Sequence, residues 1–263
     1  MLNTIIKIHT QIKTTFVQWF PAFILIFSLL VIWEISCRIA DVPKWLLPVP
    51  TDIVIELYQH WDLLLHHSFV TMYEILIGFS FSIVTGTLIG GFIVYSKTLE
   101  KTLYPIIISS QTIPIIAIAP ILLVWFGYGL LPKVLVVGLI AFFPIAVNTI
   151  DGLKSIDEDI VKMMKTLGAN KSQIFKKIQI PNSLPYIFTG LRIGMAASVI
   201  GAVISEWVGS SEGLGYLMIR SKPQFLTERV FAAIFLLSII GFLLFLLVNY
   251  CEKKIVYWKT SSE

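Results

Sequence analysis

Few residues of the 263-residue chain could do covalent chemistry. No nucleophile is accompanied by a general base in a recognisable constellation, so no catalytic centre is predicted. His66 and His67 are adjacent, and neighbouring residues on a helix point about 100° apart, so they do not form a metal-binding pair. The two cysteines, Cys37 and Cys251, lack the spacing of a metal site. The sequence therefore predicts neither a catalytic nor a metal site in this chain.

Charged residues at the ends of long apolar segments are more informative, because a charge in such a segment is costly and often functional. Glu206 ends one segment, just before a glycine-rich stretch that contains Gly213 and Gly215. We expect these three at an outer face or gate, with contact between Glu206 and interfacial water as the alternative. Glu74 could extend its carboxylate to the membrane surface, and Arg192 could do the same or neutralise a neighbour.

Polar residues also interrupt the apolar segment at about residues 104–126. Gln111 and Thr112 lie within it, and Pro114 follows them. A proline frees a backbone carbonyl, which in lipid needs a packed or wet environment. A simple membrane anchor has no use for such residues, whereas a helix bundle around a pathway does. We therefore predict that these three residues line a pathway, with helix packing as the alternative.

The composition identifies the solvent around these residues. The chain is 56% hydrophobic and only 14% charged, and its mean hydropathy is +0.84. A soluble domain is roughly 45–50% apolar and about 25% charged, so soluble enzymes and disordered tails are excluded. The formal net charge is +4. The lysines lie in short loops between apolar runs, which favours a role in membrane orientation over nucleic-acid binding.

Six apolar segments are long enough to cross a bilayer, which takes roughly 20 helical residues. Their continuous rather than alternating hydrophobicity favours helices over a β-barrel. The first is predicted to be an uncleaved span, because no cleavage pattern clearly follows it. Residues 49–67 predict a short surface helix. We expect one all-α transmembrane domain, residues 1–263, with spans at about 18–39, 69–95, 104–126, 133–150, 186–208 and 229–250.

Basic residues predict the orientation of these spans, because cytoplasmic loops carry an excess of Lys and Arg. With the N-terminus inside, 13 of the 20 basic residues fall on the inner side and six on the outer side. This distribution predicts a multi-pass protein with both termini cytoplasmic. The inner residues are Lys7, Lys13, Lys97, Lys101, Lys154, Lys162, Lys165, Lys171, Lys176, Lys177, Lys253, Lys254 and Lys259.

The long inner loop, residues 151–185, is predicted to contain two helices around a glycine turn. Ser155 and Glu158 have the spacing of a capping box for the first helix. Gly168 ends this helix, since glycine adopts the positive φ of a C-terminal turn without strain. The apolar stripe of the first helix follows the i, i+3, i+4, i+7 pattern. It consists of Ile160, Met163, Met164 and Leu167.

The second helix of this loop is predicted to be capped by Asn170 with Gln173 and stopped by Pro181. Its stripe consists of Ile174, Phe175 and Ile178. Both stripes need burial, either against the spans and lipid headgroups or in a groove of a soluble partner, and periodicity favours neither. DNA-binding proteins also use two helices and a turn, but spans closely flank both ends of this loop. No nucleic-acid contact is therefore expected.

The spacing from Gly168 through nine residues to Ile-Gln-Ile-Pro at 178–181 resembles the loop of permease subunits of binding-protein-dependent ABC importers. In that family the loop has Glu-Ala-Ala, three residues, Gly, nine residues and Ile-x-Leu-Pro. Lys-Met-Met at 162–164 replaces Glu-Ala-Ala here, so the contact of the family's glutamate is not carried over. The resemblance extends over about residues 47–248.

Other stretches are similar to one branch of this family, whose members import aliphatic sulfonates, taurine, nitrate and thiamine-pyrimidine precursors. Residues 111–129 and 142–148 are most similar to permeases of the pyrimidine-precursor and riboflavin type. The resemblance implies a pyrimidine precursor as substrate, with sulfonate, taurine or nitrate as alternatives. The matching stretches are Gln-Thr-Ile-Pro at 111–114, Trp-Phe-Gly at 125–127, Ala-Phe-Phe-Pro at 141–144, and Glu206 with Gly-Leu-Gly at 213–215.

The resemblance further implies a six-helix, type I importer fold in a bacterial-type cytoplasmic membrane. The implied partners are ABC ATPase subunits, an extracytoplasmic binding protein, membrane lipid and a second copy of the chain. ATP and Mg²⁺ would bind the ATPase, because this chain has no Gly-x-x-x-x-Gly-Lys-Ser/Thr loop and is not itself an enzyme. The implied coupling residues are Met163, Met164, Leu167, Gly168, Ala169, Ile174, Phe175, Ile178 and Pro181.

Two other classes of protein compete with this interpretation. A self-sufficient channel or secondary transporter would lack the coupling helices and would more often show an internal repeat, which is not evident here. A membrane-embedded enzyme would need a catalytic cluster, and none is recognisable in the sequence.

Overall fold

The structure is a computed structural model that describes the backbone of residues 2–258 and the side chains of residues 20, 21 and 23–258. The side chains of Lys7 and Lys13, and all of Lys259, lie outside the described residues. All regular structure in the described chain is helical. The chain forms two compact units, a smaller one of residues 1–61 with 221–232, and a larger one of residues 62–220 with 233–263.

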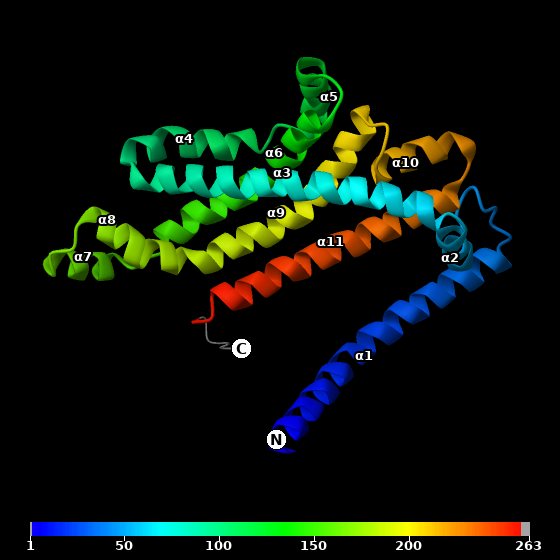
Figure 1. The fold of residues 1–263 in the computed structure, drawn as a ribbon, viewed down its shortest axis with the longest axis horizontal. Helices are drawn as coiled ribbons and strands as arrows, with labels where there is room; N and C mark the ends of the chain where they lie inside the picture. The colour runs from blue at the N-terminus through cyan, green and yellow to red at the C-terminus, as the bar shows by residue number, and fades with distance from the viewer. Residues whose placement is uncertain (1, 259–263) are drawn as a thin grey trace. The chain divides into compact units, whose positions relative to one another are not determined.

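The helices are drawn in Figure 1. In chain order they are α1 (Leu2–Ile39), α2 (Pro50–Gln59), α3 (Trp61–Tyr95), α4 (Lys97–Ser110), α5 (Ile115–Phe126), α6 (Leu130–Lys154), α7 (Glu158–Thr166), α8 (Lys171–Ile174), the π-helical turn η1 (Phe175–Gln179), α9 (Ile180–Gly209), α10 (Leu214–Ser221), the 3-10 turn η2 (Lys222–Gln224) and α11 (Thr227–Ile255).

The prediction of an all-α membrane protein is confirmed. Among the described residues, four helical stretches are long and apolar enough to cross a membrane, or up to five if the bent pair α4 and α5 forms one span. The four are α3, α6, α11 and the continuous stretch Lys171–Gly209. The first predicted span, 18–39, includes side chains outside the described residues, so the count of six spans stays a prediction.

The predicted span 104–126 is not one continuous helix. It is broken between α4 and α5, which meet at 99°. Pro114 has no N–H and disfavours the helical conformation in the residue before it. The preceding N–H groups bond three residues back instead, as Gln111 does to the carbonyl of Ile108 at 3.3 Å. The Thr112 hydroxyl donates to the Ser109 carbonyl at 2.7 Å and stabilises the break.

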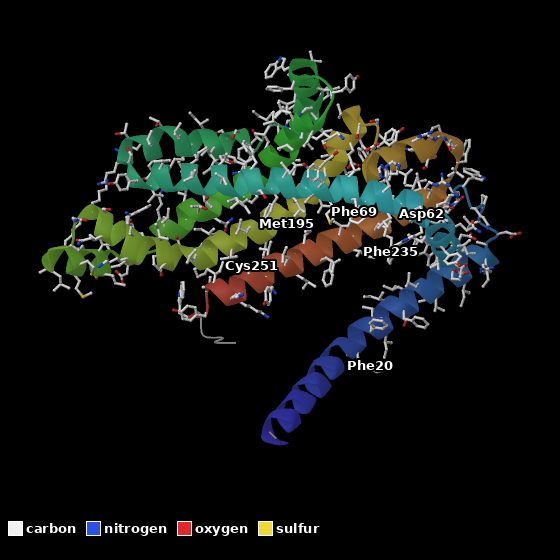
Figure 2. All side chains as sticks on the ribbon, viewed as in Figure 1. Phe20, Asp62, Phe69, Met195, Phe235 and Cys251 are labelled. Atoms are coloured by element: carbon white, nitrogen blue, oxygen red, sulfur yellow. The ribbon has the colours of Figure 1, made fainter. Side chains whose placement is uncertain are left out.

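In the larger unit, α6 packs closely against both α3 and α9. A Cβ added at Gly78 of α3 would lie 2.5 Å from the Cβ of Val137, and one added at Gly201 of α9 would lie 3.0 Å from the Val137 Cα. Met195, labelled in Figure 2, is a buried residue of the same core on α9. Helices in lipid associate through such close contact of small residues, so α6 positions the other spans.

In the smaller unit, the end of α1 is tied to α2 by polar contacts. The Glu34 carboxylate accepts hydrogen bonds from Arg38 at 2.6 Å and from the hydroxyl of Thr51 at 2.9 Å. Lys44, in the connecting loop, donates to Asp52 at 2.8 Å, and this bond raises the pKa of Lys44. The surface helix predicted for residues 49–67 ends earlier, because residues 61–67 already belong to α3.

The close packing of α3 on α6 makes a prediction. Gly78→Ala should destabilise the protein by about 1–3 kcal/mol, because the new methyl group overlaps Val137 in a packed core. Gly91→Ala on the same helix is the matched control, since a Cβ there meets nothing within 4 Å. Thermal unfolding of the purified protein in detergent measures both. Equal melting temperatures for the two variants would contradict this packing.

Candidate functional site

The loop between α6 and α9 begins with a capped helix, α7. Its cap is Asp157, whose carboxylate accepts the N–H of Asp159 at 2.9 Å. The prediction that Ser155 caps this helix is wrong. Ser155 extends the last turn of α6, and its hydroxyl donates to the Gly152 carbonyl at 2.9 Å. Asp157 suits the position because its negative charge faces the positive end of the helix dipole.

The glycine turn and the second cap agree with the prediction. Gly168 has φ +84°, which glycine adopts without strain. The Gly168 N–H donates to Lys165 and the Ala169 N–H to Met164, both at 3.0 Å, which closes the end of α7. Asn170 and Gln173 then form a complete capping box for α8. Both helices of the loop therefore start and end at defined residues.

The prediction that Pro181 stops the second helix is wrong. α8 passes through the π-helical turn η1 into α9, so residues 171–209 form one continuous helical stretch. The Ile180 N–H donates to the Phe175 carbonyl five residues earlier. This shift in hydrogen bonding places Pro181 in the first turn of α9, where a missing N–H is tolerated. The second half of the loop is thus an extension of a membrane span.

The two apolar stripes have different environments. Ile174 of α8 is buried, and the Phe175 ring packs on the Tyr95 ring of α3 at 5.6 Å. On α7, by contrast, no residue is buried, and Met163 and Leu167 are 57% and 75% exposed. The chain therefore covers the second stripe itself and leaves the first uncovered.

Lys171 fixes this loop to α3. Its ammonium donates to the Tyr95 carbonyl at 2.7 Å and lies 4.4 Å from the centre of the Tyr95 ring. Within the larger unit, Figure 1 shows α7 and α8 at one end and α10 at the other. The loop is thus held at one end of the helix bundle.

The α10 end of the larger unit is organised around Glu206. This carboxylate, only 1% exposed, accepts hydrogen bonds from the Thr71 hydroxyl at 2.6 Å, the Gly215 N–H at 2.5 Å and the Tyr216 N–H at 3.3 Å. It neither reaches water nor presents itself to a partner in this structure. The carboxylate instead stabilises the start of α10, where backbone N–H groups have no helical partner.

The predicted glycines are explained by this carboxylate. Gly213 has φ +110°, and a Cβ there would overlap the Glu206 carboxyl group. A Cβ at Gly215 would lie 2.8 Å from Oε2 of the same group. Only glycine lets the backbone approach the carboxylate so closely. Glu206, Gly213 and Gly215 therefore form one structural unit, and their predicted role at an outer face or gate stays a prediction.

Thr71 and His67 of α3 complete this cluster, although the sequence pointed to His67 only as one of two adjacent histidines and did not point to Thr71. The Thr71 hydroxyl accepts the Leu214 N–H at 2.8 Å, and Nδ1 of His67 accepts the Gly213 N–H at 3.0 Å. His67 is buried. A signal was present in the sequence, because His67, Thr71 and Glu74 follow the i, i+4, i+7 spacing of one helix face.

Two part-buried ion pairs connect spans of the larger unit. Lys133 of α6 donates to the Glu74 carboxylate and to the Ser210 hydroxyl, both at 2.6 Å. Glu74 is buried, so the prediction that it extends to the membrane surface is wrong. Arg192 of α9 pairs with Glu252 of α11, which is the neutralising role that the sequence allowed. Each ionic group in this part of the bundle thus has a partner on another helix or loop.

Gln111, Thr112 and Pro114 are brought together at the break between α4 and α5. Their side chains are exposed in the described chain, and Thr112 bonds within its own turn. Non-helical backbone at membrane depth is tolerated where it is covered by protein or lines a wet cavity. Their predicted role in lining a pathway stays a prediction.

These features define a multi-pass helical membrane subunit with an uncovered amphipathic helix. Residues 82–257 match the family described as the binding-protein-dependent transport system inner membrane component, and the chain belongs to this family. It is the permease subunit of an ABC importer, in which ATP hydrolysis is carried out by a partner subunit.

Several curated proteins are similar over most of their length. A formylaminopyrimidine transport permease, ThiX of Halalkalibacterium halodurans, is 43% identical and aligns with 88% of this chain and 92% of its own length. The riboflavin transport permease RibX of Chloroflexus aurantiacus is 34% identical, over 89% of this chain and 88% of its own. The putative aliphatic sulfonates permease SsuC of Bacillus subtilis is 30% identical, over 93% of this chain and 90% of its own length.

A solved structure supports the fold. An inward-facing form of the MetNI methionine ABC transporter includes a chain that superposes with a TM-score of 0.63. The alignment covers 76% of this chain and 97% of that chain, with 20% sequence identity. This likeness identifies the type I importer permease fold.

The Glu206 cluster makes a prediction. Glu206→Ala should destabilise the protein by at least about 1–3 kcal/mol, because it leaves the N–H groups of Gly215 and Tyr216 without their acceptor and removes the bond from Thr71. Glu212→Ala is the matched control, since the Glu212 side chain is 54% exposed. Thermal unfolding in detergent compares the two. A Glu206→Ala protein as stable as the control would show that this carboxylate does not hold the loop.

Proposed function

We propose that α7 binds a groove on the ATPase subunit and transmits its movement to the membrane spans. The observation that carries this proposal is the uncovered apolar stripe of α7, next to a second stripe that the chain buries itself. An amphipathic helix commonly binds a partner through such a stripe. ATP and Mg²⁺ would be bound by the ATPase subunit, and the α7 end of the bundle would be cytoplasmic, with both termini.

The continuity of the loop with α9 supports a mechanical role. Residues 171–209 form one helical stretch, and Lys171 ties its first turn to α3. A displacement of α7 by the ATPase would therefore move α9 directly. The coupling residues are Met163, Met164 and Leu167 for contact, Gly168 and Ala169 for the turn, and Ile174, Phe175, Ile178 and Pro181 for the connection to α9.

The opposite end of the bundle would receive the extracytoplasmic binding protein. Residues 210–213 connect α9 to α10, and Glu206 bonds to the first turn of α10 directly after this loop. Its role is therefore to position the loop. Two copies of the chain would enclose the pathway, with the break at residues 111–114 facing it.

The proposed substrate is a pyrimidine precursor of thiamine. The support is the 43% identity to a permease named for formylaminopyrimidine transport. Relatives named for riboflavin, aliphatic sulfonates and taurine are 34%, 30% and 29% identical, and make these compounds the alternatives, together with nitrate.

The coupling role of α7 predicts the effect of a double variant. Met163→Ser with Leu167→Ser should weaken binding to the ATPase at least tenfold, because each buried apolar side chain contributes about 1.5–3 kcal/mol. Co-purification and a titration of the two subunits in detergent measure the loss. The melting temperature of the isolated permease should not change, since both side chains are exposed.

Lys162→Gln is the matched control, because Lys162 lies on the opposite face of α7 and is exposed. It should retain the ATPase like the original chain. If the double variant retained the ATPase equally well, α7 would not be the coupling helix. Uptake by the permease alone in liposomes would instead indicate a self-sufficient transporter.

The substrate proposal is tested on the partner binding protein. Formylaminopyrimidine should raise its melting temperature, whereas riboflavin, taurine, an alkanesulfonate and nitrate should not. Proteoliposomes with permease, ATPase and binding protein should then accumulate the pyrimidine in an ATP-dependent manner. Stabilisation and uptake of one of the other compounds alone would identify it as the substrate.

A further inference from the structure

The larger unit contains a groove that neither the coupling role nor the pathway explains. It has a volume of about 510 Å³ and lies between α3, α6, α9 and the α8–η1 turn. We infer that this groove binds an anionic glycerophospholipid, with an acyl chain along the helices and the phosphate at Lys176. The inference rests on the proposed cytoplasmic side of the α7 end, because the lipid would belong to the inner leaflet.

The walls of the groove suit a hydrocarbon chain. Leu88, Phe92, Leu153 and Ile187 line it, and three of its hydroxyl groups already have acceptors. Thr87, Thr149 and Ser183 each donate to a carbonyl of their own helix. A polar ligand would find few partners along these walls, whereas an acyl chain needs none.

A lysine ammonium group that has no partner among the described residues lies at the mouth of the groove. Lys176 and Ser172 lie at the end toward α8. Lys171 nearby is occupied by the Tyr95 carbonyl and ring. Lys176, by contrast, forms no hydrogen bond or ion pair with any residue in the part of the chain that the structure describes. An ammonium group at the inner membrane surface attracts anionic headgroups, with about 1 kcal/mol per basic residue.

Gly91 keeps the groove open. Its neighbour Gly90 is packed, because a Cβ there would lie 2.9 Å from the Cβ of Thr149. Gly91 lines the groove, and a Cβ there would meet nothing within 4 Å. A helical glycine costs about 1 kcal/mol relative to alanine, and packing within the described chain does not require one here. The missing side chain instead supplies space for a ligand.

The distribution of polarity along the groove favours a lipid over a helix of a second copy. On α3 the groove extends from Thr87 to Tyr95, which corresponds to about 12 Å along the helix axis. The lining is mainly apolar over this length, and its lysine, Lys176, lies at the α8 end. An anionic lipid has the same division into an apolar chain and a charged headgroup at one end.

The test uses the full chain in phosphatidylcholine nanodiscs with traces of a lipid that carries a photoreactive acyl chain. Photoreactive phosphatidylglycerol should label peptides of residues 87–95 and 172–187 several-fold more than photoreactive phosphatidylcholine does. Lys176→Gln should reduce phosphatidylglycerol labelling to the phosphatidylcholine level. Lys177→Gln, which removes a neighbouring charge outside the groove, should leave the preference intact.

A second pair of variants tests the groove itself. Gly91→Leu should abolish labelling by both lipids, and Gly91→Ala should retain it, while thermal unfolding shows that both proteins are folded. Equal labelling by the two lipids, an unchanged preference in Lys176→Gln, or crosslinks to a second copy in place of lipid would overturn the inference. Labelling requires no ATPase, so the lipid site and the coupling role of α7 can fail independently.

Discussion

Within a bilayer, each backbone and charged group has to find its partner inside the protein, because no water is available to replace it. Glu206 shows what this constraint requires. A single buried carboxylate accepts three hydrogen bonds, from a side chain of α3 and from two N–H groups at the start of α10. The glycines at 213 and 215 follow from it, because no side chain fits between the loop backbone and the carboxylate. The loop that follows α9 is therefore held by hydrogen bonds within the protein.

The same constraint explains the connection at the other end of α9. A coupling loop that met the span through an irregular turn would expose carbonyl groups and would bend under load. The π-helical turn instead bonds the Ile180 N–H to the Phe175 carbonyl, directly before Pro181. With the Asn170 capping box at its start, the helical stretch from α8 through α9 is continuous. The apolar stripe of α7 is the part left without cover, and this is the surface that a partner subunit would need.

The fold and part of the loop between α6 and α9 could be predicted from the sequence, because they depend on local chemistry. The helical fold, the glycine turn at Gly168 and the Asn170 cap depend on residues within a few positions of one another. Two local predictions failed, at Ser155 and Pro181, because the adjoining helices α6 and α9 extend further than their apolar cores suggest. The contact of Thr71 with Glu206 joins residues 135 positions apart, and a single sequence carries no direct signal for such a pair. The spacing of His67, Thr71 and Glu74 indicated a polar face on α3 but not what faces it.

α9 connects these two ends. Its 30 residues begin at the π-helical turn and end just beyond Glu206, a distance of about 45 Å along the helix axis. The Thr71 partner of its Glu206 carboxylate lies on α3, which is also the helix that Lys171 holds at the opposite end. A shift of α9 relative to α3 would thus act at once on the Thr71–Glu206 bond and on the Lys171–Tyr95 bond. In an importer this geometry would let one helix pair relate the state of the ATPase at one face to the shape of the binding-protein surface at the other.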